Sequence, residues 1–538
     1  MDAGSHPWWQ DAVFYEIYVR SFQDSDGDGV GDLRGILQRI PYLVELGVDA
    51  VWLTPFYPSP MADFGYDVAD YCGVDPLFGS LDDFDALLAA LRRAGIRTVV
   101  DFVPNHTSDQ HPWFVDSRRS RTSPRRDWYV WRDPSPAGGP PNNWLSQSGG
   151  PAWTFDPATG QYYLHSFLPE QPDLNWGHPG VRAAMLDVLR FWLSRNVDGF
   201  RVDVLTGLSK DPLARDDPPN PRHREGDPDF MRLEQVNSAN GPALLDHVAA
   251  MRSVLSEFGP DRVLIGEVYR PVETLVAFYG EGERSVHLPF NFNLMWLRWV
   301  PEGILGLVRT YEEALPPGAW PTWVLGNHDH PRVASRLGRA QARIAMMLLL
   351  TLRGTPTLYQ GDELAMEDVP VPPGQGRDRF AAAGPGRGRD PQRAPMPWDD
   401  APGRGFSRGR PWLPLPPPGQ PASAGAQARE ATSMLRLTQA LLRLRRAEAV
   451  LRRGAWRALS ASGPVLAYER VLGDRICRVV LNLGQAPVSV DLGFAGAQLA
   501  VSTHARPRGT LHRAGLDLDA DEGVVMLGEA GSGREQSP

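Results

Sequence analysis

The sequence has 538 residues, of which 42% are hydrophobic and 22% are charged, and its formal net charge is −9. This composition is close to the globular average, so it excludes a collagen-like or wholly disordered chain. Acidic residues outnumber basic ones, 64 to 55, and the arginines are scattered, which argues against nucleic-acid binding. No apolar run approaches the roughly 20 residues that span a membrane. We therefore expect a globular protein without nucleic-acid or membrane partners.

The cysteines and the first residues bear on the compartment. Cys72 and Cys477 are too few to build a disulfide scaffold in a chain of this size. The first ten residues have neither the basic nor the apolar region of a secretory signal peptide. These features predict a reduced, cytoplasmic compartment.

Short apolar strands alternate with amphipathic helices through most of the chain. Eight strands in such an alternation predict an α/β fold, a parallel (β/α)8 TIM barrel, with functional residues where strands end. The expected strands are 13–17, 50–54, 97–102, 198–204, 263–268, 285–292, 322–326 and 355–360. The expected helices are 33–46, 81–94, 181–196, 242–258 and 339–352.

Two long connections interrupt this alternation. Residues 105–177, rich in Trp, Pro, Gly and Asn, are predicted to form a small inserted domain B after the third strand. A Pro/Gly/Arg-rich insert at about 360–420 follows the eighth strand, and 428–446 reads as an amphipathic helix. Short alternating segments predict a C-terminal antiparallel β domain over 456–538. Residues 1–104 and 178–455 are then the two parts of the barrel.

Three acids stand at the ends of expected barrel strands: Asp203, Glu267 and Asp329. A local ion pair, such as Asp203 with Arg201, would explain one such acid. Three acids on strands four, five and seven would instead converge on one rim. Cleavage of a glycosidic bond needs such a set, with one carboxylate attacking the anomeric carbon and one carboxyl protonating the leaving oxygen.

Several ordered motifs extend this interpretation. The chain contains DFVPNH at 101–106, GFRVD at 199–203, GEV at 266–268 and GNHD at 326–329. It also contains GVDAVWLTP at 47–55, GTPTLYQG at 354–361, QPDLN at 171–175 and RAPMPW at 393–398. Together they resemble the ordered regions of the α-amylase superfamily of glycoside hydrolases, in its α-glucosidase and oligo-1,6-glucosidase branch.

The resemblance implies roles for individual residues. Asp203 would be the nucleophile, Glu267 the general acid/base and Asp329 the transition-state stabiliser. The residues implied in substrate binding are Asp63, Tyr66, Asp101, His106, Phe167, Gln171, Arg201, His328 and Arg393. The implied outcome is retention of the α configuration, with the two carboxyls roughly 5–5.5 Å apart.

Two neighbours of the expected nucleophile carry further expectations. Arg201 lies two residues before Asp203 on the same face of its strand, so it is expected to keep that carboxylate ionised. Val204 follows Asp203, and strand alternation would turn it away from the reacting carbon. In the branch that the chain resembles, valine at this position goes with tolerance of α-1,6 links.

An acidic loop follows the first expected strand. DSDGDGVGD at 24–32 offers oxygen ligands from Asp24, Asp26, Asp28, the Val30 carbonyl and Asp32. Position 12 of a calcium-binding loop would be Gly35 instead of the bidentate glutamate, which excludes a true EF-hand. The α-glucosidase branch carries a similar loop. The prediction is a structural Ca²⁺ (or Mg²⁺) site.

Together these features favour an exo-acting α-glucosidase that releases glucose from short α-glucosides. A glucosyl transferase or isomerase, such as a trehalose synthase or a sucrose-active enzyme, stays open as an alternative because the covalent step is shared. A non-catalytic barrel is less favoured because all three acids are present. Small oligosaccharides are the expected partners, and a monomer or small homo-oligomer the expected state.

Overall fold

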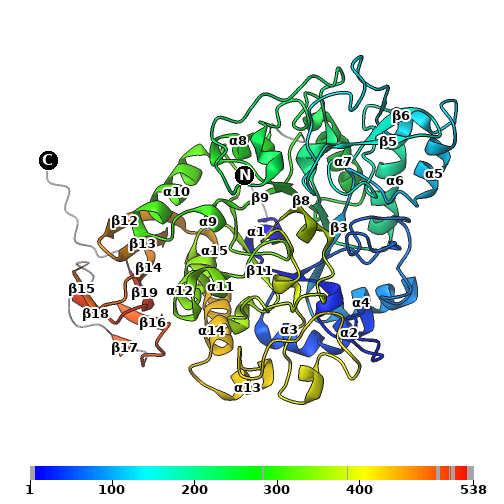
Figure 1. The fold of residues 1–538 in the computed structure, drawn as a ribbon. Coiled ribbons are helices and arrows are strands. Elements are labelled where there is room, and N and C mark those ends of the chain that lie inside the picture. The colour runs from blue at the N-terminus through cyan, green and yellow to red at the C-terminus, as the bar shows by residue number, and fades with distance from the viewer. Residues whose placement is uncertain are drawn as a thin grey trace, which may run out of the picture.

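A nearly closed barrel of eight parallel strands forms the centre of the molecule (Figure 1). The computed structural model describes residues 6–280, 284–384, 386–491, 497–507, 509–510 and 515–529. The strand order is β10-β11-β1-β2-β3-β7-β8-β9, and every pair is parallel. The barrel strands are β1 Phe14–Ile17, β2 Ala50–Leu53, β3 Arg97–Phe102, β7 Gly199–Val202, β8 Val263–Val268, β9 Leu288–Asn291, β10 Thr322–Val324 and β11 Thr355–Tyr359. This confirms the predicted fold class.

A side chain joins the two end strands of the sheet. The Thr322 hydroxyl of β10 accepts a hydrogen bond from the Asn291 backbone N–H at 3.2 Å and donates one to the Pro289 carbonyl at 2.7 Å. The strands are buried almost throughout, which explains why they read as continuous apolar runs. Polar residues within them therefore stand out as candidates for function.

Helices surround the barrel, as Figure 1 shows. Ser80 caps α4 in a capping box with Asp83, and Pro179 occupies the first turn of α6, where no backbone N–H is needed. The longer helices are α4 Leu81–Arg93, α6 Pro179–Ser194, α7 Leu244–Glu257, α10 Pro301–Ala314, α12 Arg339–Thr351 and α14 Met434–Ala447. The shorter ones are α1 Trp8–Asp11, α2 Leu33–Gln38, α3 Ile40–Leu46, α5 Pro112–Arg119, α8 Val272–Leu275, α9 Asn293–Trp296, α11 Val333–Leu337, α13 Ala424–Arg429 and α15 Ala449–Arg453.

Some expected boundaries were wrong for identifiable reasons. The single helix expected over 33–46 is two helices that meet at Arg39, because Pro41 in the first turn of α3 cannot donate a backbone hydrogen bond. The amphipathic helix begins later than expected, where the Ser433 side chain accepts from the Arg436 N–H. The fourth strand ends at Val202, so Asp203 and Val204 lie in the loop beyond it.

The segment between β3 and β7 contains a small antiparallel sheet of order β4-β6-β5. Its strands are β4 Trp131–Arg132, β5 Trp153–Asp156 and β6 Gln161–Leu164. It has its own small apolar cluster around Trp144 and Trp153. The Trp144 indole donates to the Arg215 carbonyl at 2.9 Å, so this segment is tied to the loop after β7. The domain boundaries themselves stay a prediction.

Antiparallel strands follow the barrel and lie to its left in Figure 1. Six of them form a sheet of order β12-β13-β14-β19-β16-β17, and β15 pairs with β18. The strands are β12 Ala455–Ser462, β13 Val465–Leu472, β14 Arg475–Asn482, β15 Val488–Asp491, β16 Gln498–Ser502, β17 Gly509–Thr510, β18 Gly515–Leu518 and β19 Gly523–Glu529. The Tyr468 hydroxyl bonds to Thr351 of α12 at 2.5 Å, which ties this sheet to the barrel.

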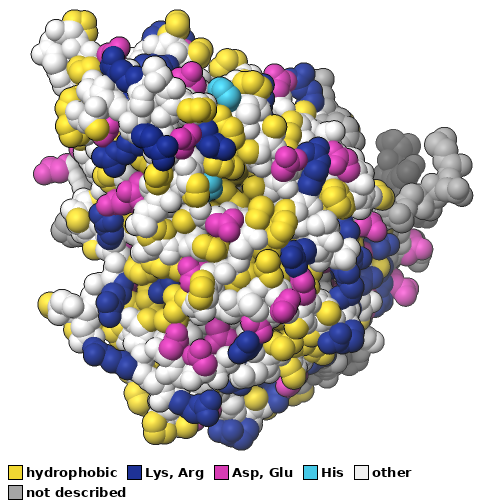
Figure 2. All heavy atoms as spheres, turned by 90° about the vertical axis from the view of Figure 1, so that its right-hand side faces the viewer, with side chains coloured by type: hydrophobic (Ala, Val, Ile, Leu, Met, Phe, Trp, Pro, Cys, Tyr) yellow, Lys and Arg dark blue, Asp and Glu magenta, His cyan; other side chains and the backbone are white. Residues whose placement is uncertain are grey.

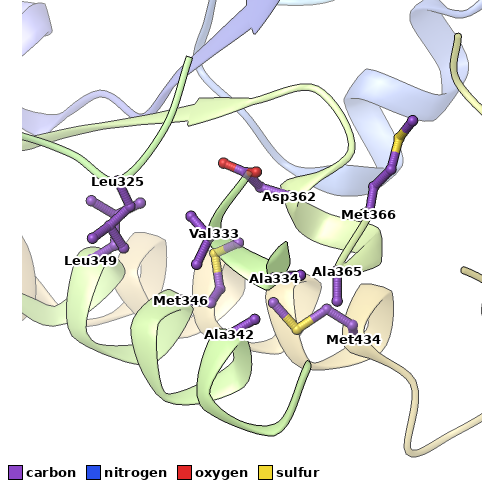
Figure 3. A pocket seen from close by; sticks show the side chains of 10 residues that line it. All are labelled: Leu325, Val333, Ala334, Ala342, Met346, Leu349, Asp362, Ala365, Met366 and Met434. Atoms are coloured by element: carbon purple, nitrogen blue, oxygen red, sulfur yellow. The ribbon is translucent and has the colours of Figure 1, made fainter. Parts of the chain in front are cut away.

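The surface and the interior each show one feature that bears on function. On the face drawn in Figure 2, acidic and basic side chains are intermixed and form no large patch of one sign. Among the described residues, no helix is long and apolar enough to cross a membrane. A small, mostly apolar cavity is lined by side chains of α11, α12 and α14 and by one acid, Asp362, which follows β11 (Figure 3). Burial raises the pKa of Asp362 to about 7, although Arg332 lowers it.

Candidate active site

The acids predicted at strand ends lie at the carboxyl end of the barrel. Glu267 is within β8, Asp101 is within β3, and Asp203 immediately follows β7. The Asp203 backbone N–H donates to the Phe102 carbonyl at 2.8 Å, which fixes the turn out of the strand. Asp329 lies in the loop after β10. Parallel strands place these ends on one rim.

One guanidinium holds three of these acids together. Arg201, whose side chain is 0% exposed, contacts Asp101 Oδ1 at 2.9 Å, Asp203 Oδ1 at 2.7 Å and Glu267 Oε1 at 2.6 Å. The guanidinium also stacks over the Trp52 ring, 4.9 Å from its centroid. The contacts with Asp101 and Asp203 are charge-assisted hydrogen bonds, which are strong and directional in a buried setting, whereas the contact with Glu267 is an ion pair. Arg201 therefore fixes both the positions and the mutual spacing of the carboxylates.

Burial opposes the expectation that Arg201 keeps Asp203 ionised. Burial raises the pKa of Asp203 well above its ordinary value by more than Arg201 lowers it, and the charges of Glu267 and Asp101 raise it further. Burial likewise raises the pKa of Asp101 to about 6 against the opposing effect of Arg201. One cation cannot neutralise several buried anions, so Asp203 and Asp101 keep their protons to a higher pH than isolated carboxyls do.

Val204 has a backbone conformation that its sequence did not reveal. Its φ of 46° and ψ of 45° are left-handed, which is unusual for a β-branched residue. This conformation points its N–H to Glu267 Oε2, which accepts at 2.8 Å. The assumption that Val204 continues the alternation of the strand was therefore wrong. Strained backbone that positions a polar group is characteristic of functional sites.

Asp329 is flanked by two arginines and a histidine. Its Oδ1 lies 2.7 Å from Arg393 Nη2 and 3.3 Å from Arg389 Nη1, and its Oδ2 lies 3.3 Å from His328 Nε2. Burial alone would raise the pKa of Asp329, but His328, Arg389 and Arg393 together hold it below its usual range. Asp329 is therefore a permanent anion, unlike the cluster around Arg201.

His328 connects this side of the site to the barrel floor. Its Nδ1 lies 2.5 Å from Glu16 Oε1 of β1, and its Nε2 lies 2.8 Å from the Tyr66 hydroxyl. The Tyr66 ring stacks on the His328 ring, and its hydroxyl also donates to Asp101 Oδ2 at 3.1 Å. Tyr66, His328 and Asp101 thus form one continuous polar wall.

The remaining predicted residues meet on the opposite wall. The Gln171 amide donates to Asp63 Oδ2 at 3.1 Å and lies 3.1 Å from His106 Nε2. The Phe167 ring packs 5.2 Å from the His106 ring. Asp63 in turn contacts Arg389 Nη2 at 2.5 Å. Each predicted catalytic or substrate-binding residue therefore contacts another member of this one network, although their roles stay predictions.

Sequence reasoning missed Glu16 and Arg389. Glu16 lies in the first strand, whose alternation gave no sign that an acid would meet His328, 312 residues away. Arg389 stands four residues before Arg393 in an arginine-rich insert, where nothing distinguished it from its neighbours. Its buried guanidinium bridges Asp63, Asp329 and Asp378. A search for charged residues near known motifs could have found Arg389, but not Glu16.

The acidic loop brings together three of its predicted ligands. Asp24, Asp26 and Asp28 each offer one oxygen within 4.8 Å of the others. Asp24 accepts backbone N–H bonds from Asp26, Gly27 and Gly29, a turn that curls the loop around that carboxylate. Asp32 is instead the N-cap of α2, where it accepts the Gly35 N–H at 2.7 Å. Val30 contacts this group through its N–H, which donates to Asp28 Oδ1 at 2.7 Å, and the ligand role predicted for its carbonyl stays a prediction.

The loop has the electrostatics of a cation site. Among the described residues, no ion pair neutralises Asp24, Asp26 or Asp28. Burial and then the charges of Asp26 and Asp24 raise the pKa of Asp28, against the Val30 N–H bond, which lowers it. A divalent cation would relieve this repulsion, and carboxylate oxygens are the ligands that Ca²⁺ and Mg²⁺ prefer. The residues therefore fit the predicted ion.

A (β/α)8 barrel with paired carboxylates on its rim defines an enzyme of the sugar-cleaving class. Residues 16–454 match the family model "Alpha amylase, catalytic domain". The chain is 40% identical over 503 residues to a probable alpha-glucosidase of Rhizobium meliloti, covering 90% of this chain and 91% of that protein. It is 36% identical to an oligo-1,6-glucosidase of Parageobacillus thermoglucosidasius, with 89% and 91% covered. The chain belongs to the α-amylase family of glycoside hydrolases.

Solved structures agree with this assignment. An α-glucosyl transfer enzyme, XgtA, superposes with a TM-score of 0.92 at 38% identity, covering 97% of this chain and all of that chain. The trehalulose synthase MutB from Pseudomonas mesoacidophila superposes with a TM-score of 0.88 at 32% identity over the same shares. These neighbours establish the fold throughout the described barrel and its sheets.

Proposed function

We propose that the chain is a retaining, exo-acting α-glucosidase that hydrolyses short α-1,4 and α-1,6 glucosides, such as maltose and isomaltose, and releases glucose. One observation carries the proposal: the Arg201 guanidinium bridges Asp203 and Glu267 at 2.7 and 2.6 Å. Two carboxyls on one guanidinium are close neighbours, as retention requires, whereas inversion needs a wider gap for a water molecule. Relatives named alpha-glucosidase and oligo-1,6-glucosidase support the same activity.

The first half-reaction follows from this arrangement. Asp203 attacks the anomeric carbon and forms a glucosyl ester while the bond from that carbon to the leaving oxygen breaks. Glu267 gives its proton to the leaving oxygen, so the first product departs as a neutral alcohol. Asp203 must be ionised and Glu267 protonated for this step.

The second half-reaction restores the enzyme. Glu267, now ionised, takes a proton from water as the water oxygen attacks the anomeric carbon. The ester bond to Asp203 breaks, and glucose leaves in the α configuration. Asp329, held as an anion by Arg389 and Arg393, stabilises the positive charge that develops on the sugar ring in both transition states.

Contacts on the inner wall support exo action. The Asp63–Arg389 ion pair joins the loop after β2 to the insert after β11, 326 residues apart. Gln171 and His106 lie beside it. We expect this ion pair to block the site beyond the first bound glucose, so that only the end of an oligosaccharide can enter. Aligned polar groups there are suited to the hydroxyls of one terminal glucose.

The acidic loop would hold a Ca²⁺ or Mg²⁺ ion through Asp24, Asp26 and Asp28, and its role would be structural. The loop packs tightly against the end of the second insert: the Trp412 N–H donates to the Gly29 carbonyl at 2.9 Å. A side chain at Gly29 would collide with the Arg410 carbonyl. An ion at this point would stiffen the insert that carries Arg389 and Arg393.

A glucosyl transferase is the second candidate, supported by the likeness to the α-glucosyl transfer enzyme and the trehalulose synthase. The two functions share the covalent step and differ only in the acceptor. Incubation with maltose, isomaltose, sucrose and trehalose, followed by proton NMR, tests both. Hydrolysis gives α-glucose first, and its absence with a new disaccharide as the main product would favour transfer. Initial β-glucose would overturn the retaining mechanism.

A further inference from the structure

Lys210 is the single lysine among the 55 basic residues of the sequence. It follows the short helix η3 (Leu205–Leu208) in the loop after β7, and its side chain is 10% exposed. Its ammonium lies 2.9 Å from Asp173 Oδ2 and donates to Asn105 Oδ1 at 3.1 Å and to the Gly207 carbonyl. Three acceptors around one nitrogen match the three donors of an ammonium group.

These contacts converge on His106. Because Lys210 occupies Asn105 Oδ1, the atom that faces His106 Nδ1, at 3.1 Å, is Asn105 Nδ2. An amide nitrogen only donates, so His106 Nδ1 must accept and the ring hydrogen must be on Nε2. With its hydrogen on Nε2, His106 donates to the Tyr66 carbonyl at 3.2 Å, and the Gln171 amide nitrogen, 3.1 Å from the same Nε2, donates to Asp63 Oδ2 instead.

The buried Asp173 completes the arrangement. Its Oδ1 accepts from Asn105 Nδ2 at 3.3 Å and from the Ser166 N–H at 2.9 Å. Burial would raise the pKa of Asp173, but Lys210 and the Ser166 bonds lower it, so it is an anion. Lys210 thus fixes both the amide orientation and the charge of the groups behind His106.

We infer that Lys210 is a positioning residue, which acts through Asn105 and Asp173 to hold His106 neutral with its hydrogen on Nε2, where a bound sugar hydroxyl would compete with the Tyr66 carbonyl for that hydrogen. The identity of that ligand rests on the proposed function. Arginine cannot replace Lys210, because a guanidinium spreads its donors over a plane and cannot bring one nitrogen to three converging acceptors. This explains a lone lysine in a chain that otherwise uses arginine.

Nitrogen NMR of protein labelled with ¹⁵N-histidine tests the inference without any substrate. A His106→Asn variant identifies the His106 signals among the 12 histidines. The expected result is an unprotonated Nδ1 and a protonated Nε2 in the wild type at pH 7. A protonated Nδ1 in the wild type would overturn the inference outright, whatever the variants do.

Substitution at Lys210 should change that signature. The Lys210→Met substitution removes the cation and leaves Asp173 as the charged group nearest His106. Asp63 lies farther away, on the other side of Gln171. Loss of the nearby cation raises the histidine pKa, and burial otherwise lowers it, to about 4 in the wild type. An upward shift of about one pH unit and mixed tautomers are expected. Lys210→Arg should fail to restore the wild-type spectrum, and full restoration would contradict the geometric argument.

Steady-state kinetics test the role of Lys210 independently of the NMR measurement. A lost hydrogen bond from His106 should lower kcat/KM for maltose about tenfold, mostly through KM, since a typical net hydrogen bond gives about that factor. The control is Arg132→Met, which removes a donor to the Pro212 carbonyl in the same loop without touching Asn105, Asp173 or His106. If Lys210→Met does not fold, Lys210→Gln takes its place.

The outcomes separate the two proposals. Unchanged tautomer and unchanged kcat/KM in a folded Lys210 variant would overturn the positioning role. A wild type that shows the expected tautomer but cleaves none of the four disaccharides would overturn the proposed function and leave the positioning geometry intact.

Discussion

Two groups of carboxylates in this molecule show opposite ways of managing like charges. Around Arg201, Asp203 and Glu267 are buried and meet one guanidinium. In the acidic loop, Asp24 is buried and Asp28 is exposed, and backbone N–H groups are their nearest partners. The first arrangement fixes the spacing of the acids and leaves them short of positive charge. The second gives the acids backbone donors in place of a shared cation.

The pKa directions express this difference. Burial raises the pKa values of Asp203 and Asp101 in spite of Arg201. In the loop, bonds from Ser407 and from the Gly27 and Gly29 N–H groups outweigh burial and lower the pKa of Asp24. Burial therefore prevails over the one arginine at the barrel rim, whereas in the loop hydrogen bonds prevail at Asp24 and burial prevails at Asp28.

The largest effect should come from the nucleophile. Asp203→Asn should lower kcat on maltose by roughly 10⁴-fold or more, since the covalent step is lost while the fold stays intact. Circular dichroism and steady-state kinetics measure both. Asp198→Asn is the matched control, because Asp198 precedes the same strand at its other end and pairs with Arg97 at 2.8 Å. Near-normal turnover by Asp203→Asn would refute the proposed mechanism.

Asp362 is a third case, in which burial is the largest influence on the pKa of a carboxyl group. Its pKa is raised to about 7, above an unfolded value of about 3.9. The protonated form is favoured in the fold, so this stabilisation is complete below pH 4 and is lost as the pH rises through 7. Asp362→Asn should remove a slope of up to about 1.4 kcal/mol per pH unit between these values.

Urea unfolding of the wild type and of Asp362→Asn at several pH values checks this. Asp187→Asn, an exposed acid on α6 paired with Arg190, should leave the slope of the wild type unchanged. Parallel curves for Asp362→Asn and the wild type would contradict the assignment of the raised pKa.

The loop should respond to metal. At a free Ca²⁺ concentration 100 times the dissociation constant, binding should add about 2.7 kcal/mol to the free energy of unfolding. Asp26→Ala and Asp28→Ala should lose most of this gain, with little effect on kcat. Melting with calcium and with chelator measures it, and Asp187→Ala serves as a charge-matched control. Identical wild-type melting curves with calcium and with chelator would contradict the proposed ion site.

The smallest effect concerns linkage. Val204 lies beside both carboxylates, and its side chain offers only shape, which discriminates by about 1–3 kcal/mol. Val204→Ala should shift the ratio of kcat/KM toward maltose and away from isomaltose by roughly tenfold, about 1.4 kcal/mol. The wild type should cleave both sugars. An unchanged ratio would refute this account of linkage choice but not the glucosidase proposal.

Much of this arrangement could be predicted because its parts are local. Strands such as 97–102 and 263–268 read as apolar runs, and Asp101 and Glu267 stand out within them. The features that escaped prediction depend on distant pairing or on tertiary constraint. Glu16 can be recognised as part of the site only from its contact with His328, and Arg389 only from its contact with Asp63. Val204 took a left-handed conformation that strand propensity disfavours, because the turn must aim its N–H at Glu267.

The long sequence separations within the site bear on synthesis. The Glu16–His328 and Asp63–Arg389 contacts join residues 312 and 326 positions apart. A nascent chain that has emerged only through β11 already carries Asp203, Glu267 and Asp329, yet it lacks the two arginines that fix Asp329. Contacts of this range form late, after the costly closure of long loops. The three predicted catalytic acids are therefore synthesised before the two arginines that hold Asp329, and this part of the site is incomplete until residue 393 has emerged.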